Sequence, residues 1–111
     1  MDVTIIPYKH CSLVKLTGRL DSDAVEEIEA QLNSLVESGE YRLVFDLSEV
    51  NFISSKGWWL LIGIQKACKR FARGEVVLAC LAERIQNSLR LVGMTDYFRT
   101  FDDITSAVGY F

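Results

Sequence analysis

The chain contains 111 residues, of which 50% are apolar and 24% are charged, a balance typical of a globular protein with a hydrophobic core. This length is enough for one core, so we expect residues 1–111 to form a single domain. The net charge of −3 argues against a general nucleic-acid binder, which needs a basic face to neutralise phosphates.

The first half of the chain predicts two strands, a helix and a third strand. Residues 3–8 and 12–17 are expected to be strands joined by a turn near Lys9, with Gly18 ending the second. Residues 21–38 have apolar side chains at helical spacing. Asp23 and Glu26 resemble a capping box for this helix, although Asp21 or Ser22 can also cap it, and Gly39 suits its C-terminus. Residues 43–47 then form a nearly continuous apolar strand, typical of a sheet covered on both faces.

The second half predicts alternating helices and strands. A helix is expected over about residues 56–71, with Phe71 pointing inward and Gly74 as its end, followed by a buried strand over 76–81. A helix over 82–92, stopped by Gly93, precedes a short strand over 97–101 and a last helix from Asp102. The order β-β-α-β-α-β-α-β-α predicts an α/β fold, with a mixed sheet of about five strands and about four helices packed on it.

The three cysteines and the N-terminus bear on location and cofactors. Cys11, Cys68 and Cys80 have neither C-x-x-C spacing nor paired histidines, so we expect no disulfide framework, metal site or cofactor. Cys68 and Cys80 lie in apolar runs and are expected in the core. The N-terminus lacks the features of a signal peptide, and no run of 18 or more apolar residues could span a membrane. We therefore expect a cytoplasmic protein.

Charged residues gather in two places on the predicted helices. The basic group lies at the end of the second helix, where cations are stabilising without any partner. It consists of Lys66, Lys69, Arg70 and Arg73. The acidic group lies on the outward face of the first helix, and it is either a solvated face or an acidic partner surface. It consists of Glu26, Glu27, Glu29 and Glu37.

The most informative segment is Val-Asn-Phe-Ile-Ser-Ser-Lys-Gly-Trp-Trp-Leu-Leu, residues 50–61. It places Ser54 and Ser55 on a loop at the start of the second predicted helix. The N-terminus of a helix carries free N–H groups and a partial positive charge, so it favours an anion. A hydroxyl at this position can cap the helix, bind a phosphate or carry one covalently.

Three motifs occur in a characteristic order along the chain. They are Gly18-Arg19-Leu20-Asp21 after the second predicted strand, Phe52-Ile53-Ser54-Ser55-Lys56-Gly57-Trp58 before the second helix, and Leu89 to Met94 after the third helix. With this layout the chain resembles the STAS domain of anti-sigma-factor antagonists over nearly its whole length. The resemblance implies the STAS fold.

The resemblance also implies that Ser55 is a phosphoacceptor, with Ser54 as the less favoured candidate. Two positions depart from the family pattern, because Ser54 replaces an aspartate and Lys56 replaces a Ser or Thr. The hydroxyl of Ser55 could instead only cap the helix, a role that Ser54 could also fill, and capping and phosphorylation can coexist. Lys56 opposes the helix dipole, so it either pairs with a phosphate or an acidic partner group, or is a solvated lysine without a role.

The expected partner-binding residues surround the serines. Trp58 is expected to pack inward, and Trp59, about 100° further around the helix, to be partly exposed as an interface anchor or a half-buried packing residue. Asp21 could shape the same surface or only cap the first helix. The expected set is Asp21, Ser54, Lys56, Gly57 and Trp59.

These residues favour a regulatory protein-binding module over an enzyme. The resemblance implies a module, monomeric when free, that holds an anti-sigma kinase or similar partner and releases it when Ser55 is phosphorylated. The alternative is a non-phosphorylated STAS subunit of a larger assembly, such as a lipid-transport ABC complex or a stressosome-like scaffold. An enzyme is not expected, because His10 has no nucleophile partner and neither a Gly-rich phosphate loop nor a G-x-S-x-G elbow is present.

Overall fold

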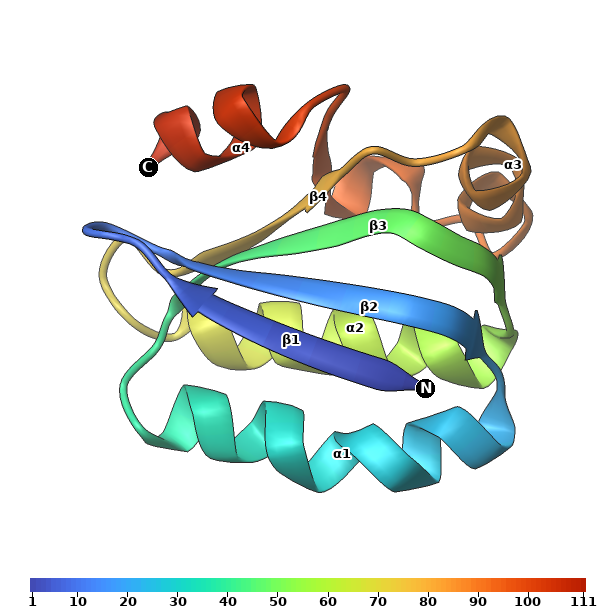
Figure 1. The fold of residues 1–111 in the computed structure, drawn as a ribbon, viewed down its shortest axis with the longest axis horizontal. Coiled ribbons are helices and arrows are strands. Elements are labelled where there is room, and N and C mark those ends of the chain that lie inside the picture. Colours follow the sequence, from blue (N-terminus) through green and yellow to red (C-terminus); the bar gives the residue numbers. More distant parts are fainter.

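The computed structural model describes residues 1–111 and contains the predicted series of elements (Figure 1). In chain order they are β1 (Asp2–Pro7), β2 (Ser12–Leu20), α1 (Ser22–Glu37), β3 (Arg42–Ile53), α2 (Ser55–Lys69), β4 (Glu75–Ala79), α3 (Glu83–Leu91), the 3-10 turn η1 (Thr95–Tyr97), β5 (Arg99–Phe101) and α4 (Ile104–Tyr110). The predicted order of strands and helices is therefore confirmed, with one additional 3-10 turn.

The five strands form one mixed sheet in the order β1-β2-β3-β4-β5. β1 and β2 are antiparallel, whereas the three other neighbouring pairs are parallel. Each parallel pair is joined by a crossover that contains a helix, as parallel pairing requires. The predicted α/β class and mixed sheet are confirmed.

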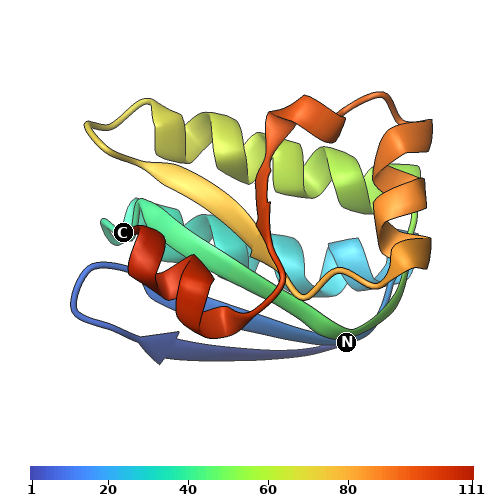
Figure 2. The same ribbon diagram turned by 90° about the horizontal axis from the view of Figure 1, so that it is seen from above.

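Helices cover both faces of the sheet (Figures 1 and 2). α1 and α2 lie side by side on one face, where the main core of 24 buried residues is found. α4 lies on the other face over a smaller apolar cluster that includes Leu13, Val44 and Val77. Val44 and its neighbour Phe45 point to opposite faces, and both are fully buried. The apolar run of β3 thus corresponds to a strand covered on both sides.

Two strands are longer than predicted. β2 continues through Gly18, which has a φ of 119°, as far as Leu20. β3 continues past residue 47 to Ile53 through an irregular stretch in which Asp46 Oδ1 accepts a hydrogen bond from the Ser48 N–H at 3.0 Å. The polar residues of this stretch interrupt the apolar run, but pairing with β2 resumes beyond them and ends at Leu20 and Ile53. The ends of β2 and β3 therefore meet directly before α1 and α2.

The caps of α1 differ in part from the prediction. Asp21 is the N-cap, because its Oδ1 accepts the N–H of Ala24 at 3.0 Å. The capping box predicted for Asp23 and Glu26 is therefore wrong, and the alternative cap, Asp21, is confirmed. Gly39 has a φ of 103° just past the helix and donates its N–H to Val36 O at 3.0 Å, as expected for a left-handed C-terminal residue.

α2 ends at Lys69, earlier than predicted, and Phe71 does not point inward. Phe71 is 43% exposed and stacks on Tyr41, with ring centroids 3.7 Å apart. Cys68 is in the core as predicted, where burial raises the pKa of its thiol to about 11. Cys80 is only half-buried and has a φ of 62° just beyond β4, so its predicted core position is not confirmed.

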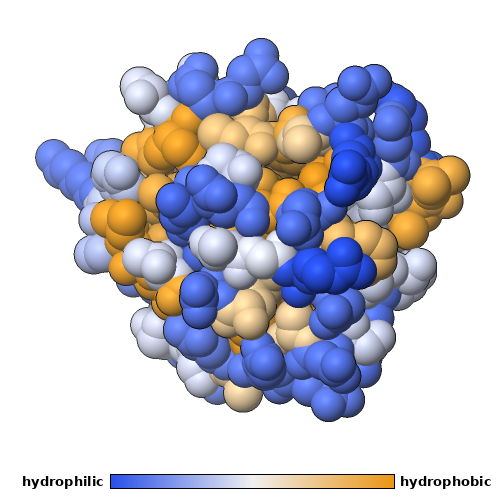
Figure 3. Space-filling model, turned by 45° about the vertical axis from the view of Figure 1, so that its right-hand side comes forward, coloured by the Kyte–Doolittle hydropathy of each residue, from blue (hydrophilic) through white to orange (hydrophobic).

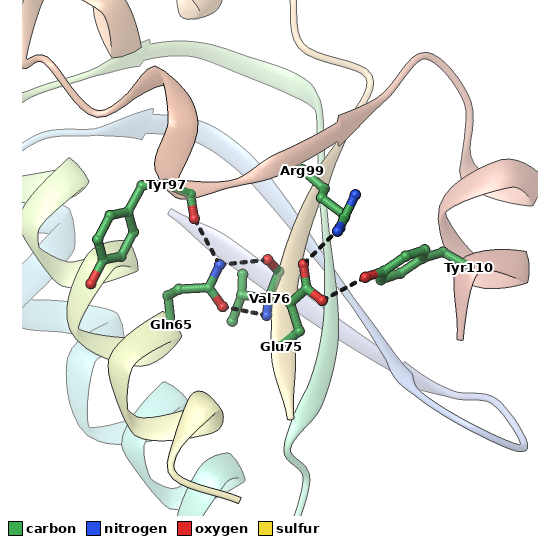
Figure 4. Close-up of polar contacts among 6 residues, drawn as sticks. All are labelled: Gln65, Glu75, Val76, Tyr97, Arg99 and Tyr110. Atoms are coloured by element: carbon green, nitrogen blue, oxygen red, sulfur yellow. Dashed lines mark hydrogen bonds and ion pairs between the residues drawn. The ribbon is translucent and has the colours of Figure 1, made fainter. Parts of the chain in front are cut away.

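Gln65 completes the hydrogen bonding of β4 where β5 has not yet begun. β5 pairs with β4 only from Val77 onward. The fully buried Gln65 side chain accepts the Val76 N–H at Oε1 (2.6 Å) and donates from Nε2 to Val76 O and to Tyr97 O (both 3.0 Å) (Figure 4). Its carboxamide thus takes the place of a peptide group of the missing strand.

Gln65→Leu should lower the free energy of unfolding by about 3 kcal/mol, because a leucine leaves two buried groups of Val76 and the part-buried Tyr97 O without this partner. Urea denaturation followed by circular dichroism measures this loss. The control is Gln31→Ala on the exposed face of α1, which should change stability by less than about 0.5 kcal/mol. Equal stability of the two variants would contradict the role of Gln65.

Candidate functional site

Ser54 joins the ends of β2 and β3 to the start of α2. Its N–H donates to Leu20 O at 2.9 Å, and its hydroxyl lies 3.2 Å from the same carbonyl. The hydroxyl oxygen also accepts the N–H of Gly57 at 3.1 Å, which makes Ser54 the N-cap of α2. The hypothesis that Ser55 caps this helix is therefore wrong, and the alternative cap, Ser54, is confirmed, since β3 runs directly to Ile53 and leaves the capping position to Ser54.

Ser55 is the first residue of α2 and is exposed. No hydrogen bond within the protein holds its hydroxyl, so the oxygen is free to face solvent or a partner. By helix geometry the N–H groups of Ser55 and Lys56 also lack acceptors within α2. A negatively charged group attached to Ser55 would lie beside these donors and the positive end of the helix dipole.

The two tryptophans point in different directions, as predicted. Trp58 is 1% exposed, and its indole Nε1 donates to Ser88 Oγ on α3 at 2.8 Å. Ser88 Oγ in turn donates to Ile53 O at 3.1 Å, so one hydroxyl satisfies both buried groups. Trp59 is 55% exposed on the outer side of the same helix turn. Trp58 thus fixes α2 against α3, while the indole of Trp59 is available for a contact.

The remaining predicted residues differ in accessibility. Lys56 is exposed, and its Nζ lies 3.8 Å from Glu26 Oε1 on α1, a weak surface contact. Asp21 is half-buried and caps α1. Gly57 is buried, and a Cβ there would come within 2.7 Å of Leu20 O. Ser55, Lys56 and Trp59 therefore present side chains to solvent, whereas Asp21, Ser54 and Gly57 shape the backbone beneath them.

A groove beside the serines was not predicted from the sequence. It has a volume of about 520 Å³ and lies between the end of β3 and α3. Phe52, Ser88 and Leu91 are among its lining residues, and Leu91 is 88% exposed. The guanidinium of Arg19 lies 4.4 Å from the centre of the Phe52 ring. Figure 3 shows apolar patches among hydrophilic residues on the side of the molecule to which α3 belongs.

The sequence signal for this groove is weak. Leu91 falls outside the apolar stripe of α3 that Ile85 and Leu89 bury in the core, so it could have been singled out as an apolar residue left on the surface. The groove itself forms only when α3 packs against β3. Residues that meet there are far apart in the sequence, such as Ser88 and Ile53, which are hydrogen-bonded across a separation of 35 positions.

Comparisons with known proteins agree with this structure. The family model of the STAS domain matches residues 3–107, and the chain belongs to the STAS family. A similar relative is the protein described as putative anti-sigma factor antagonist BtrV of Bordetella bronchiseptica, which is 29% identical over 96 residues, 86% of this chain and 82% of that protein.

Solved structures share the fold at low sequence identity. The anti-sigma factor antagonist SpoIIAA in its unphosphorylated form has a TM-score of 0.81 at 16% identity, covering 96% of this chain and 93% of that chain. The Bacillus cell fate determinant SpoIIAA in the phosphorylated form has a TM-score of 0.76 at 17% identity and covers 98% of both chains. A sulfate transporter family protein from Wolinella succinogenes has a TM-score of 0.77 at 19% identity, covering 95% and 87%.

A further observation concerns membranes. None of the helices combines the length and the apolar character that crossing a bilayer requires.

The two serines should differ in their contribution to stability. Ser54→Ala removes the acceptor of the Gly57 N–H and should lower the free energy of unfolding by about 1–2 kcal/mol. Ser55→Ala removes a hydroxyl with no protein partner and should change it by less than about 0.5 kcal/mol. Thermal and urea unfolding of both variants tests this difference, and a larger loss for Ser55→Ala would contradict the capping assignment.

Proposed function

We propose that the protein is a non-enzymatic regulatory module that acts as an anti-sigma factor antagonist in a bacterial cytoplasm. In this proposal residues 1–111 work as one domain, monomeric when free and without a cofactor. The observation that carries the proposal is the free, exposed hydroxyl of Ser55 at the start of α2. The likeness to BtrV, which is described as a putative anti-sigma factor antagonist, supports it.

The proposed switch is phosphorylation of Ser55 by a partner kinase. The Ser55 oxygen attacks the γ-phosphorus of ATP held by that kinase, ADP leaves, and the hydroxyl proton passes to a base of the kinase. The phosphate adds a charge of about −1.5 to −2 at neutral pH. It would be stabilised in the free protein by the helix end and by Lys56 beside it, and it would repel an interface formed around the neutral hydroxyl.

The replacement of the family's aspartate by Ser54 is compatible with this switch. Aspartate and serine are both strong N-caps, so Ser54 retains the capping role while removing one negative charge beside the acceptor. Together with Lys56, this change makes the unphosphorylated surface more positive than the same surface with the family's usual residues would be. We therefore expect a partner whose complementary surface carries more acidic groups than that pattern would require.

The proposed partner surface combines Ser55, Lys56 and Trp59 with the neighbouring groove. Trp59 offers a large exposed side chain on a rigid helix, the type of residue that commonly dominates interface energies. Its backbone is held by the cap at Ser54 and by the buried Trp58 next to it. The anchor is therefore positioned before the partner arrives.

A second function is a constitutive subunit of a larger assembly, such as a lipid-transport ABC complex or a stressosome-like scaffold. The departures at Ser54 and Lys56 favour it, because both residues flank Ser55 on the surface that a partner kinase would contact. The shared fold with a protein of the sulfate transporter family is compatible with it. In that case Trp59 and the groove would still form the contact, and Ser55 would never be phosphorylated.

Mass spectrometry after incubation with ATP and an anti-sigma kinase from the same genome distinguishes the two functions. Phosphate should be found on Ser55, and Ser55→Ala should not be modified. The matched control is Ser54→Asp, which keeps the cap and restores the family residue, and it should still be phosphorylated. Phosphate on Ser54 would reject the assignment to Ser55, and phosphate on neither serine would favour the constitutive subunit.

Trp59→Ala should weaken the complex with the partner by about 1 kcal/mol or more at unchanged stability, because it removes an exposed anchor. Isothermal titration calorimetry measures the affinity. Gln86→Ala, an exposed change on α3, serves as the control and should leave the affinity unchanged. Equal affinity of Trp59→Ala and wild type would exclude the anchor role.

A further inference from the structure

The end of the molecule opposite Ser55 is built from four segments that are distant in sequence. Figures 1 and 2 show the β1–β2 turn, the α1–β3 loop, the α2–β4 turn and the C-terminus gathered at this end. We define the distal surface as six residues on these segments. They are Tyr8, Lys9, Arg42, Arg70, Phe71 and Arg73.

The basic residues of the distal surface have no acidic partner. The ion pairs within the structure are Met1 N-terminus to Glu27, Lys56 to Glu26, and Arg99 to Glu75, and none includes a residue of the distal surface. Four cations therefore lie together outside any ion pair in a chain whose net charge is −3.

Two of the neighbouring carboxylates are engaged by other groups. Glu40 accepts a hydrogen bond from the Ser12 hydroxyl at 2.9 Å. Glu75 accepts from the Tyr110 hydroxyl at 2.7 Å and lies 3.4 Å from Arg99 Nε (Figure 4). A third carboxylate, Glu37, lies near Arg70 and Phe71. Four cations thus lie among three carboxylates, and none of these cations is held in an ion pair.

Stabilisation of the α2 C-terminus explains only part of this cluster. Arg70 is the C-cap residue of α2, where a cation is favourable. Lys9 and Arg42 belong to other elements and cannot act on that helix end in the same way. Arg73 has a φ of 63°, an unfavourable backbone conformation for a residue with a side chain, and it still projects a cation at this end.

Three depressions lie next to one another on the distal surface. One, of about 270 Å³, includes Tyr8, Lys9 and Arg42 in its lining. A second, of about 360 Å³, is lined in part by Arg70 and Phe71 and shares Tyr41 with the first. A third, of about 350 Å³, is lined in part by Arg73 and shares Arg42 with the first. Each depression therefore combines at least one cation with at least one aromatic side chain.

We propose that the distal surface is a second docking site, for an extended acidic segment of a partner protein. The cations pair with carboxylates of the segment, and the exposed faces of Tyr8 and Phe71, 44% and 43% exposed, receive apolar side chains between them. A series of depressions suits alternating side chains of an extended peptide. A flat bilayer would span the depressions without filling them.

This site does not depend on the phosphorylation of Ser55. It lies at the other end of the molecule, whose longest dimension is 31 Å. The module could then hold the acidic segment and the partner at the Ser55 end at the same time.

The test is a titration of the 15N-labelled full chain with a synthetic peptide of about twelve residues that repeats Glu-Glu-Leu. Backbone signals of the distal surface should shift, and those of residues 54–59 should not. The affinity should fall when salt is raised, since the cations are exposed. A peptide with Gln in place of every Glu should bind at least about tenfold more weakly.

Charge reversal locates the site. The double variant Arg42→Glu with Arg73→Glu should bind the acidic peptide at least about tenfold more weakly than wild type. Lys9→Glu with Arg70→Glu, at exposed positions, should give the same result and guards against misfolding of the first variant. Lys56→Glu with Arg84→Glu at the Ser55 end should bind the peptide as wild type does.

Several results would overturn the proposal. They are the absence of shifts with the acidic peptide, shifts centred on residues 54–59, and equal affinity of both distal double variants and wild type. Vesicles containing phosphatidylglycerol and a duplex DNA oligonucleotide are tested in parallel. Tighter binding of either one than of the peptide, lost in the same variants, would replace the acidic segment with a membrane or a nucleic acid.

Discussion

The position of the candidate switch depends on the hydrogen bonds of Ser54. Its N–H donates to Leu20 O, and its hydroxyl approaches that carbonyl and accepts the Gly57 N–H. These contacts tie the end of β2 to the first turn of α2, and they require Ser54 rather than Ser55 at the N-cap. The next residue is consequently the first of the helix, with its hydroxyl outside the protein's own hydrogen bonding. An exposed Ser55 beside the helix N-terminus is thus a result of the cap.

Close packing keeps this arrangement rigid. Gly57 lets α2 approach the end of β2, since any side chain would collide with Leu20. On the other side, Ser88 satisfies both the indole of Trp58 and the carbonyl of Ile53, the residue before the cap. The helix start is therefore fixed by β2 and by α3, which places Trp59 at a defined position on the surface. A partner would meet a surface whose backbone is already ordered, and less conformational entropy is lost on binding.

Much of the fold could be predicted because periodicity and turn residues are local signals. The order of elements, the opposite directions of Trp58 and Trp59, and Gly39 at the end of α1 all follow from short stretches of sequence. The choice between neighbouring caps could not be predicted, because it depends on how far β3 continues to pair with β2. The outward position of Phe71 depends on its stacking with Tyr41, thirty positions earlier. The groove at α3 and the distal surface likewise arise only when distant segments meet.

The most direct test of the switch compares the affinity of the partner for unmodified protein and for protein carrying phosphoserine at position 55, introduced by genetic encoding or by the kinase. Calorimetry at one fixed ionic strength gives both constants. A switch at Ser55 predicts binding that is at least about a hundredfold weaker for the phosphorylated protein, because its charge lies within the contact. Equal affinity of the two forms would contradict the switch.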